Sequence, residues 1–276
     1  TAVTDQPLAA STTVPPLPVG APEPAVDLPC ETGEGPVWHD AIQRLYWLDI
    51  PAGVIYRYDP ATGENETVYR HDAAVGGITI QHDGSLILFC AQGAIYRLLG
   101  DEVEPIVPGI EREREGRFND VIADPEGRIF CGTKPTADGS ARLYRLDPDG
   151  SLQLVFDDLT LANGMGFSPD LSSFYLTDSN SRTIFRCRYE RATGTLADRE
   201  VLVRTPDDGS VPDGLAVDLD GALWSARWNG GGLFRYAPDG TLLGQVRFPV
   251  RKVSSLAFGG SACDIAFVTT GGGTSR

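Results

Sequence analysis

The amino-acid sequence predicts an all-β fold, a six-bladed β-propeller, because one pattern recurs along nearly all of the chain. Six short apolar segments each begin directly after a punctuating residue, at successive spacings of 42, 43, 44, 50 and 41 residues. A repeat of about 40 to 50 residues that contains only strands is typical of propeller blades. The equivalent residues of the six segments are Gly35, Gly77, Asp120, Gly164, Gly214 and Ser255.

The second half of each repeat supports the same fold. It contains an alternating apolar and polar stretch followed by a turn signal, as in GVIYRYDPATGE and ARLYRLDPDGSL. Such alternation, closed by Asp-Gly pairs such as Asp149-Gly150 and Asp220-Gly221, is typical of antiparallel hairpins. We therefore expect four antiparallel strands in each blade, with the innermost strand the most apolar. The aromatic residues that share one position are Tyr56, Tyr96, Tyr144, Phe185 and Phe234.

Two regions differ in composition. Residues 1–24 are rich in Pro, Ala, Thr and Ser and predict a flexible arm, whereas residues 25–276 predict the propeller. We expect the sixth blade to be incomplete, because no further apolar strand follows the segment FVTTGGGTSR. We expect the stretch around Ala25 to Cys30 to supply an outer strand that latches the ring.

Composition excludes several classes of function. The formal net charge of −15, from 23 basic and 38 acidic residues, argues against nucleic acid and anionic membranes as partners. The five cysteines form no C-x-x-C pair, which argues against zinc-finger and thioredoxin chemistry. Cys90, Cys131 and Cys187 lie in apolar strand patterns and predict buried thiols, so a cytoplasmic setting is favoured over a secreted one. The pattern leaves the oligomeric state open.

The residue before each register position predicts a site on the axis of the ring. These residues are Glu34, Gly76, Asn119, Asn163, Asp213 and Ser254. Glu34, Asn163 and Asp213 form an oxygen-only set that suits Ca²⁺, Mg²⁺ or Mn²⁺ and is acceptable to Zn²⁺. Asn-Gly and Asp-Gly pairs also form simple turns, but a shared register favours a site. Gly76 and Ser254 lack ligand groups, so we expect a pocket open towards the second and sixth repeats.

At this point the motifs show a resemblance. Gly33-Glu34-Gly35-Pro36-Val37-Trp38, Arg117-Phe118-Asn119-Asp120, Asn163-Gly164-Met165-Gly166-Phe167-Ser168 and Pro212-Asp213-Gly214 resemble the senescence-marker-protein/gluconolactonase family, which includes regucalcin. The resemblance implies one divalent metal ion, with Ca²⁺ favoured, at the mouth of the central channel. It implies Glu34, Asn163 and Asp213 as its ligands.

The same resemblance implies the substrate contacts. Arg117 would bind hydroxyl or carbonyl oxygens of the substrate, and Asn119 would lie near the metal and bind the substrate or its water. Asp120 would line the substrate site or orient a ligand through a hydrogen bond. A neutral residue is usual after the third-repeat Gly-Thr pair, and Lys134 stands there instead. Lys134 would bind an acidic group or point into solvent, with the second favoured.

The implied activity is the hydrolysis of a small-molecule sugar lactone. Asp213 would act as the general base for the attacking water. Two alternatives remain at this stage. One is hydrolysis of an aryl ester or phosphotriester at the same metal site, and the other is a non-catalytic metal-binding scaffold.

Overall fold

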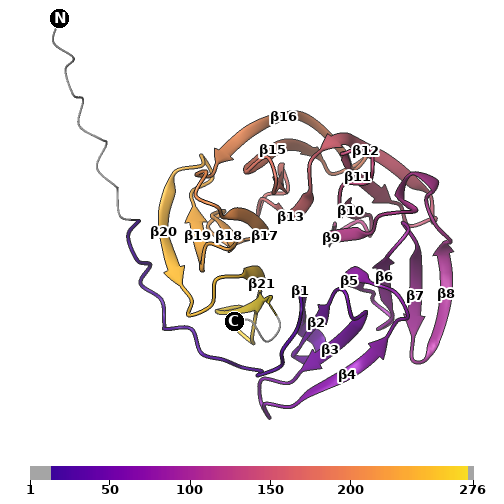
Figure 1. The fold of residues 1–276 in the computed structure, drawn as a ribbon, viewed down its shortest axis with the longest axis horizontal. Coiled ribbons are helices and arrows are strands. Elements are labelled where there is room, and N and C mark those ends of the chain that lie inside the picture. The colour runs from indigo at the N-terminus through magenta and orange to yellow at the C-terminus, as the bar shows by residue number, and fades with distance from the viewer. Residues whose placement is uncertain (1–13, 273–276) are drawn as a thin grey trace, which may run out of the picture.

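The computed structural model describes residues 14–272 and confirms the predicted six-bladed, all-β propeller (Figure 1). Within that range, five sheets have four antiparallel strands each and the sixth sheet has two. The helical segments are two 3₁₀ turns, Asp40–Ile42 and Glu111–Glu113. No helix in the described range is long and apolar enough to cross a membrane.

Each four-stranded sheet follows chain order from the channel outwards, as repeated hairpins require. The first blade contains β1 (Gly33–His39), β2 (Arg44–Asp49), β3 (Val54–Tyr58) and β4 (Asn65–Arg70). The second contains β5 (Val75–Ile80), β6 (Leu86–Cys90), β7 (Ile95–Leu99) and β8 (Glu102–Val107). The third contains β9 (Phe118–Ala123), β10 (Ile129–Thr133), β11 (Ala141–Leu146) and β12 (Leu152–Leu159).

The remaining blades continue around the ring. The fourth contains β13 (Ala162–Phe167), β14 (Ser173–Asp178), β15 (Thr183–Glu190) and β16 (Thr195–Arg204). The fifth contains β17 (Val211–Val217), β18 (Leu223–Trp228), β19 (Gly232–Tyr236) and β20 (Leu242–Arg247). The sixth contains β21 (Val253–Gly259) and β22 (Ile265–Thr270), so the expectation of an incomplete blade is confirmed.

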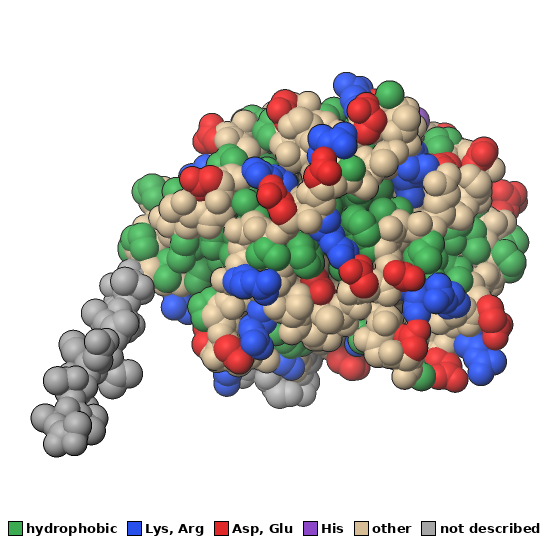
Figure 2. All heavy atoms as spheres, turned by 90° about the horizontal axis from the view of Figure 1, so that it is seen from above, with side chains coloured by type: hydrophobic (Ala, Val, Ile, Leu, Met, Phe, Trp, Pro, Cys, Tyr) green, Lys and Arg blue, Asp and Glu red, His purple; other side chains and the backbone are tan. Residues whose placement is uncertain are grey.

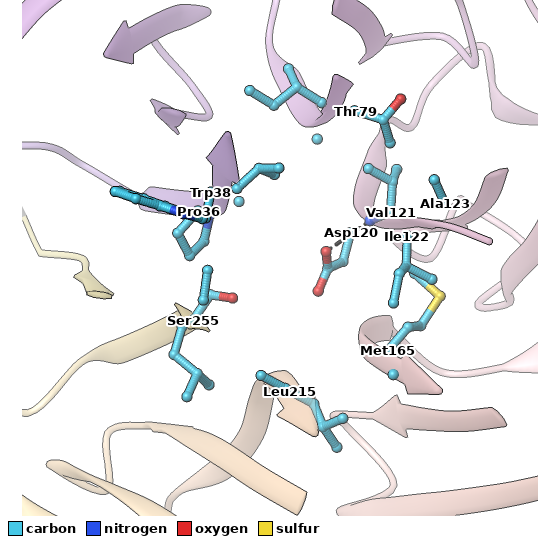
Figure 3. Close-up of a pocket in the computed structure, with 18 of the residues that line it drawn as sticks. Pro36, Trp38, Thr79, Asp120, Val121, Ile122, Ala123, Met165, Leu215 and Ser255 are labelled. Atoms are coloured by element: carbon cyan, nitrogen blue, oxygen red, sulfur yellow. Dashed lines mark hydrogen bonds between the residues drawn. The ribbon is translucent and has the colours of Figure 1, made fainter. Parts of the chain in front are cut away.

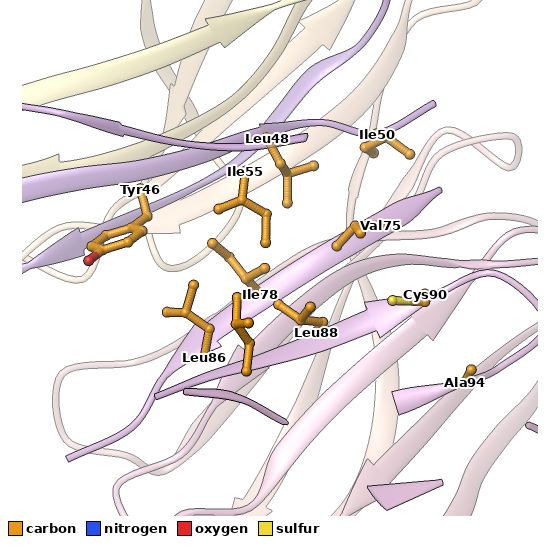
Figure 4. Close-up of a cluster of buried hydrophobic side chains, with 11 residues drawn as sticks. Tyr46, Leu48, Ile50, Ile55, Val75, Ile78, Leu86, Leu88, Cys90 and Ala94 are labelled. Atoms are coloured by element: carbon orange, nitrogen blue, oxygen red, sulfur yellow. The ribbon is translucent and has the colours of Figure 1, made fainter. Parts of the chain in front are cut away.

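The hydrophobic core lies between neighbouring blades. Leu48 and Ile55 of the first blade pack against Ile78 and Leu88 of the second, and each is at most 1% exposed (Figure 4). Fully burying an aliphatic side chain of this size stabilises the fold by about 1.5–3 kcal/mol. Each blade packs against a neighbouring blade on both of its faces. The second strands are therefore apolar on both faces: in β6, Leu88 packs towards the first blade and Phe89 towards the third. The predicted burial of Cys90, Cys131 and Cys187 is confirmed.

The segment before β1 closes the ring differently from our expectation. No outer strand forms around residues 25–30; instead Val26, Leu28 and Cys30 pack in a cluster with Phe267 of the sixth blade. Thr32 forms an isolated antiparallel bridge with Gly271, and the Gly272 N–H donates to Glu31 O at 2.9 Å. The first and sixth blades are therefore joined here by side-chain packing and a single β-bridge, with no additional strand pairing.

Residues 14–24, the part of the predicted arm that the structure describes, run along the outside of the ring (Figure 1). Pro16 forms a parallel bridge with Gln245 of β20, where the Leu17 N–H donates to Gln245 O at 3.0 Å and the Gln245 N–H donates to Pro15 O at 2.9 Å. Proline lacks a donor, so this pairing is confined to the outer edge of the fifth blade. The domain boundary near residue 24 stays a prediction.

Charges on the outer surface are mixed. The side view shows acidic and basic side chains interspersed over the ring (Figure 2). Pairs such as Arg186 with Glu200 and Arg199 with Asp158 account for part of this pattern. Exposed pairs of this kind contribute little to stability, about 0–1 kcal/mol each.

Candidate metal centre

The inner strands share a local irregularity that aims the predicted site residues at the axis. Register shifts in strand pairing occur directly after Glu34, around Asn119, between Ala162 and Met165, and between Pro212 and Leu215. A β-bulge leaves a residue outside the ladder and re-aims its side chain, often beside a functional site. Asn119, Asn163 and Asp213 lie inside the bulge of their blades, and Glu34 pairs with Leu48 at the edge of the bulge in the first blade.

Two of the predicted ligands are in direct contact. The Asn163 Nδ2 donates hydrogen bonds to Asp213 Oδ1 and, at 3.0 Å, to Ser179 Oγ. The Asn163 Oδ1 accepts the N–H of Gly164 at 3.0 Å. Asn163 is 4% exposed and Asp213 is 7% exposed. The amide thus joins the fourth blade to the fifth and holds the Asp213 carboxylate from one side.

Glu34 supplies the second carboxylate. It is 6% exposed, and the Gly35 N–H donates to its Oε2 at 2.9 Å. Burial raises its pKa well above the usual range, and the charges of Asp213 and Asp120 raise it further. Arg117 and the Gly35 hydrogen bond oppose that rise. These mutual effects show that Glu34, Asp213 and Asp120 share one electrostatic environment.

Arg117 and Asn119 form a small network beside the carboxylates. Arg117 Nη1 donates to Phe118 O at 2.8 Å and to Asn119 Oδ1 at 3.0 Å, and Asn119 Nδ2 donates to Ala162 O at 3.0 Å. Burial lowers the pKa of Arg117 to about 10, and the nearby Glu34 and Asp213 counteract this. The network fixes the guanidinium against the third blade while tying that blade to the fourth.

Asp120 points into the channel that continues below the site. This channel has a volume of about 620 Å³ and is lined mainly by apolar residues of the six inner strands. Figure 3 shows the Asp120 carboxylate and the Ser255 hydroxyl directed towards its centre. The Val121 N–H donates to Asp120 Oδ1 at 2.7 Å, yet burial raises the Asp120 pKa to about 7.

The charge balance of the site favours a bound cation. The charges of three carboxylates, Glu34, Asp120 and Asp213, act on one another, and Arg117 is the cation that acts on Glu34 and Asp213. Burial and Asp120 raise the pKa of Asp213 to about 8, against the lowering effect of the Asn163 hydrogen bond. Buried like charges are unfavourable unless they are protonated or paired with a cation. An oxygen-only set in which carboxyl groups outnumber cationic side chains fits a hard divalent ion.

The donor set depends on an amide. Among residues 14–272, no group of three or more His, Cys, Asp and Glu side chains is arranged to hold a metal ion. The candidate ligands Glu34, Asn163 and Asp213 include only two such groups, with Asn163 as the third. The assignment of these three residues as ligands therefore stays a prediction.

The expected opening towards the second and sixth blades is wrong. A Cβ atom at Gly76 would lie 1.9 Å from Phe118 O, so the third blade packs against that position. Ser254 is fully buried, and its hydroxyl donates to Gly33 O at 2.6 Å in the first blade. Both positions hold neighbouring blades together, which explains why they carry a small residue in place of a ligand.

Lys134 follows β10, and its N–H donates to Arg117 O at 3.1 Å. The Lys134 side chain is largely exposed. Its pKa is lowered by partial desolvation of the ammonium group and by the charge of Arg117. Ser179, which the motif analysis missed, accepts a hydrogen bond from Asn163. It follows Asp178 at the end of β14, and no sequence signal ties it to the site.

Fold and site together define a class: a six-bladed β-propeller with a buried, oxygen-rich acidic site on its channel axis. The model of the SMP-30/Gluconolactonase/LRE-like region matches residues 32–272. The chain belongs to this family, as the motifs indicated.

Individual similar proteins support the family assignment. The pentonolactonase XacC of Haloferax volcanii is 46% identical over 90% of this chain and 84% of its own length. Regucalcin of Bos taurus is 32% identical over 87% of this chain and 83% of its own. The structure of a gluconolactonase from Xanthomonas campestris superposes with a TM-score of 0.76 at 28% identity, covering 88% of this chain and 84% of that chain.

Proposed function

We propose that this protein is a divalent-metal-dependent hydrolase that opens a sugar lactone. The observation that supports it best is the convergence of Glu34, Asn163 and Asp213 in one buried, acidic site. A pentonolactonase and a gluconolactonase among the similar proteins support the same reaction. A 6-deoxy-6-sulfogluconolactonase of Pseudomonas putida, 33% identical over 88% of this chain, adds a third lactonase.

Glu34, Asn163 and Asp213 would hold the ion, and Ca²⁺ is favoured because all three donors are oxygens. Mg²⁺, Mn²⁺ and Zn²⁺ are the competitors to be tested. When bound, the ion would polarise the ester carbonyl of the lactone. Proton transfer and substrate binding would be carried out by side chains of the protein.

Asp213 is the proposed general base. Its carboxylate accepts the proton that the attacking water loses as the water oxygen bonds to the carbonyl carbon. The same proton passes to the ring oxygen when the ester C–O bond breaks, so the product is the hydroxy acid. The hydrogen bond from Asn163 holds the carboxylate in one orientation throughout.

Arg117 and Asn119 are the proposed substrate-binding residues, with Asp120 below them in the channel. Within residues 14–272, Nη2 and Nε of Arg117 have no hydrogen-bond partner, so they are available to sugar hydroxyl or carbonyl oxygens. Asn119 holds the guanidinium in place through Nη1. Fixing the substrate in this way lowers the entropic part of the barrier.

The test combines metal analysis with a substrate panel. The purified protein is assayed with a pentonolactone, gluconolactone, an aryl ester and a phosphotriester, before and after chelation and after addition of single metals. Chelation should abolish lactone hydrolysis, and one metal should restore it. Full activity without metal would overturn the proposal, and activity confined to the aryl ester or phosphotriester would replace the substrate class. Metal binding without hydrolysis would indicate a scaffold.

We also propose a cytoplasmic location, because Cys90, Cys131 and Cys187 are buried as unmodified apolar side chains. Cell fractionation with an antibody against the protein tests this point. Recovery in a secreted fraction would contradict it.

A further inference from the structure

The last residue of the second strand is an aspartate in two blades, and both of these blades carry a candidate metal ligand. In the first blade Asp49 pairs with Gly33, the residue before Glu34. In the fourth blade Asp178 pairs with Ala162, the residue before Asn163. Both aspartates are buried, at 7% and 3% exposure.

The two carboxylates make matching contacts. Asp49 accepts the N–H of Glu31 at 3.2 Å and of Thr32 at 3.0 Å. Asp178 accepts the N–H of Thr160 at 2.9 Å and of Leu161 at 2.8 Å. In each blade these donors stand three and two residues before the candidate ligand. The carboxylates therefore fix the backbone at the point where the chain enters the inner strand.

The fold alone does not require an aspartate there. By strand pairing, the equivalent residues of the other blades are Cys90, Thr133, Arg227 and Thr270. The backbone bond that ties each strand entry to its neighbour occurs with and without the aspartate. It joins Ile50 N to Thr32 O and Ser179 N to Leu161 O, at 3.0 Å each, and likewise Ala91 N to Ala74 O and Gly271 N to Lys252 O.

The fifth blade, which contains Asp213, meets the same need by other means. The N–H of Ser210, three residues before Asp213, donates to Asp208 Oδ1 at 3.0 Å, and Val211, two residues before Asp213, pairs with Trp228 of β18. All three blades with candidate ligands thus have an ordered strand entry. The second blade, which has Gly76 in the ligand position, has the backbone bond from Ala91 N to Ala74 O and Cys90 in place of the aspartate.

We propose that Asp49 and Asp178 are positioning residues that hold Glu34 and Asn163 in the geometry needed to bind the cation. The inference rests on the proposed function, since it takes these two residues as ligands. At a bulge the ladder bonds are interrupted, so side-chain direction depends on how the preceding residues are held. Hydrogen bonds from backbone N–H groups to a carboxylate are among the stronger ones available for that purpose.

The experiment measures Ca²⁺ binding by calorimetry for the whole protein and for Asp49→Ala, Asp49→Asn, Asp178→Ala and Asp178→Asn. The alanine variants should bind about 10- to 100-fold more weakly, as is typical when the support of a ligand is removed. The asparagine variants should lose less, because an amide oxygen still accepts one N–H. Amide hydrogen exchange at residues 31–34 and 160–163 should accelerate in the alanine variants.

Asp124→Asn is the matched control. Asp124 is 6% exposed and accepts the N–H of Glu126 and of Arg128 at 2.9 Å each, at the opposite end of the inner strands. This variant should lower the melting temperature without changing Ca²⁺ affinity. Equal weakening by Asp124→Asn, or wild-type affinity in both alanine variants, would overturn the inference. If an alanine variant does not fold, the Ca²⁺ affinity and the amide exchange rates of the corresponding asparagine variant test the positioning role instead.

Glu34→Gln separates this inference from the proposed function. If Glu34→Gln binds Ca²⁺ and every other divalent ion of the panel as the wild type does, the ligand assignment fails and the inference fails with it. If Glu34→Gln loses binding while Asp49→Ala and Asp178→Ala keep it, the metal centre stands and only the positioning role is refuted.

Discussion

The side-chain amide of Asn163 donates a hydrogen bond to the carboxylate of Asp213 across the boundary between the fourth and fifth blades. The two residues are 50 positions apart in the sequence and occupy the same bulge in consecutive inner strands. One residue of the pair orients the other, so the ligand function of each depends on the partner.

Substitution of Asn163 should therefore affect metal binding more than folding. Asn163→Ala removes an oxygen ligand and the donor to Asp213, and we expect divalent-ion affinity to fall by more than about tenfold. Asn163→Asp is the informative counterpart, because it keeps an oxygen donor but adds a carboxylate beside Asp213. It should lower the stability of the metal-free protein and regain stability when the ion is added. Thermal unfolding with and without Ca²⁺ measures both effects.

Proton release should accompany metal binding. Burial raises the pKa of Asp213 to about 8, so most Asp213 side chains hold a proton in the metal-free protein at pH 7, and burial raises the pKa of Glu34 as well. The cation binds the ionised forms, so binding releases protons and apparent affinity rises from pH 6 towards pH 8. Calorimetry in buffers of different ionisation enthalpy counts the protons. Asp213→Asn should release fewer, and buffer-independent heats would refute the linkage.

Glu113 should be required for the stability of the loop that leads to Arg117. Glu113 Oε1 accepts Arg142 Nη1 at 3.1 Å and Tyr144 OH at 2.9 Å, and Glu113 is fully buried. Glu113→Ala leaves Arg142 Nη1 without this acceptor, while Nη2 keeps its pair with Asp138, and should cost about 1–3 kcal/mol of unfolding free energy. Gly116 N donates to the backbone O of Glu113, so a shift of residue 113 would be passed to the chain just before Arg117, and we also expect KM for the lactone to rise.

Chemical denaturation and steady-state kinetics test this prediction together. Glu66 is the control, since it forms an exposed pair with Arg57. Glu66→Ala should leave both the unfolding free energy and KM nearly unchanged. An unchanged midpoint for Glu113→Ala would mean that the buried pair contributes no net stability.

Gly76→Ala should strain the contact between the second and third blades. The added methyl group would lie 1.9 Å from Phe118 O, which is backbone and cannot move aside locally. We expect a loss of about 3 kcal/mol, at the upper end of the overpacking range. Gly20→Ala is the matched control because no atom lies within 4 Å of its Cβ position. Equal denaturation midpoints for the two variants would contradict this interpretation of the blade contact.

The blade order and the meeting of the candidate ligands were predictable, because residues at the same position of successive repeats lie at equivalent places around the ring. The shared register of Glu34, Asn163 and Asp213 predicted that they converge, and they lie in one buried environment. Strand pairing was not predictable in the same way. The role of Ser254 depends on a bond to Gly33, 221 residues away. The bulges and the contacts of Asp49 likewise arise from pairing between strands, which alternation within one strand does not encode.

The meeting of residues 31–32 with residues 271–272 has a kinetic consequence. These contacts span 240 residues or so of chain, whereas the blades themselves are built from neighbouring hairpins. Closing so long a loop is entropically unfavourable until most of the blades have formed, so this seam is expected to assemble last. Glu34 lies immediately after it. Before the seam closes, the residues that precede Glu34 are not held against the sixth blade, so acquisition of full Ca²⁺ affinity would time the final step of folding.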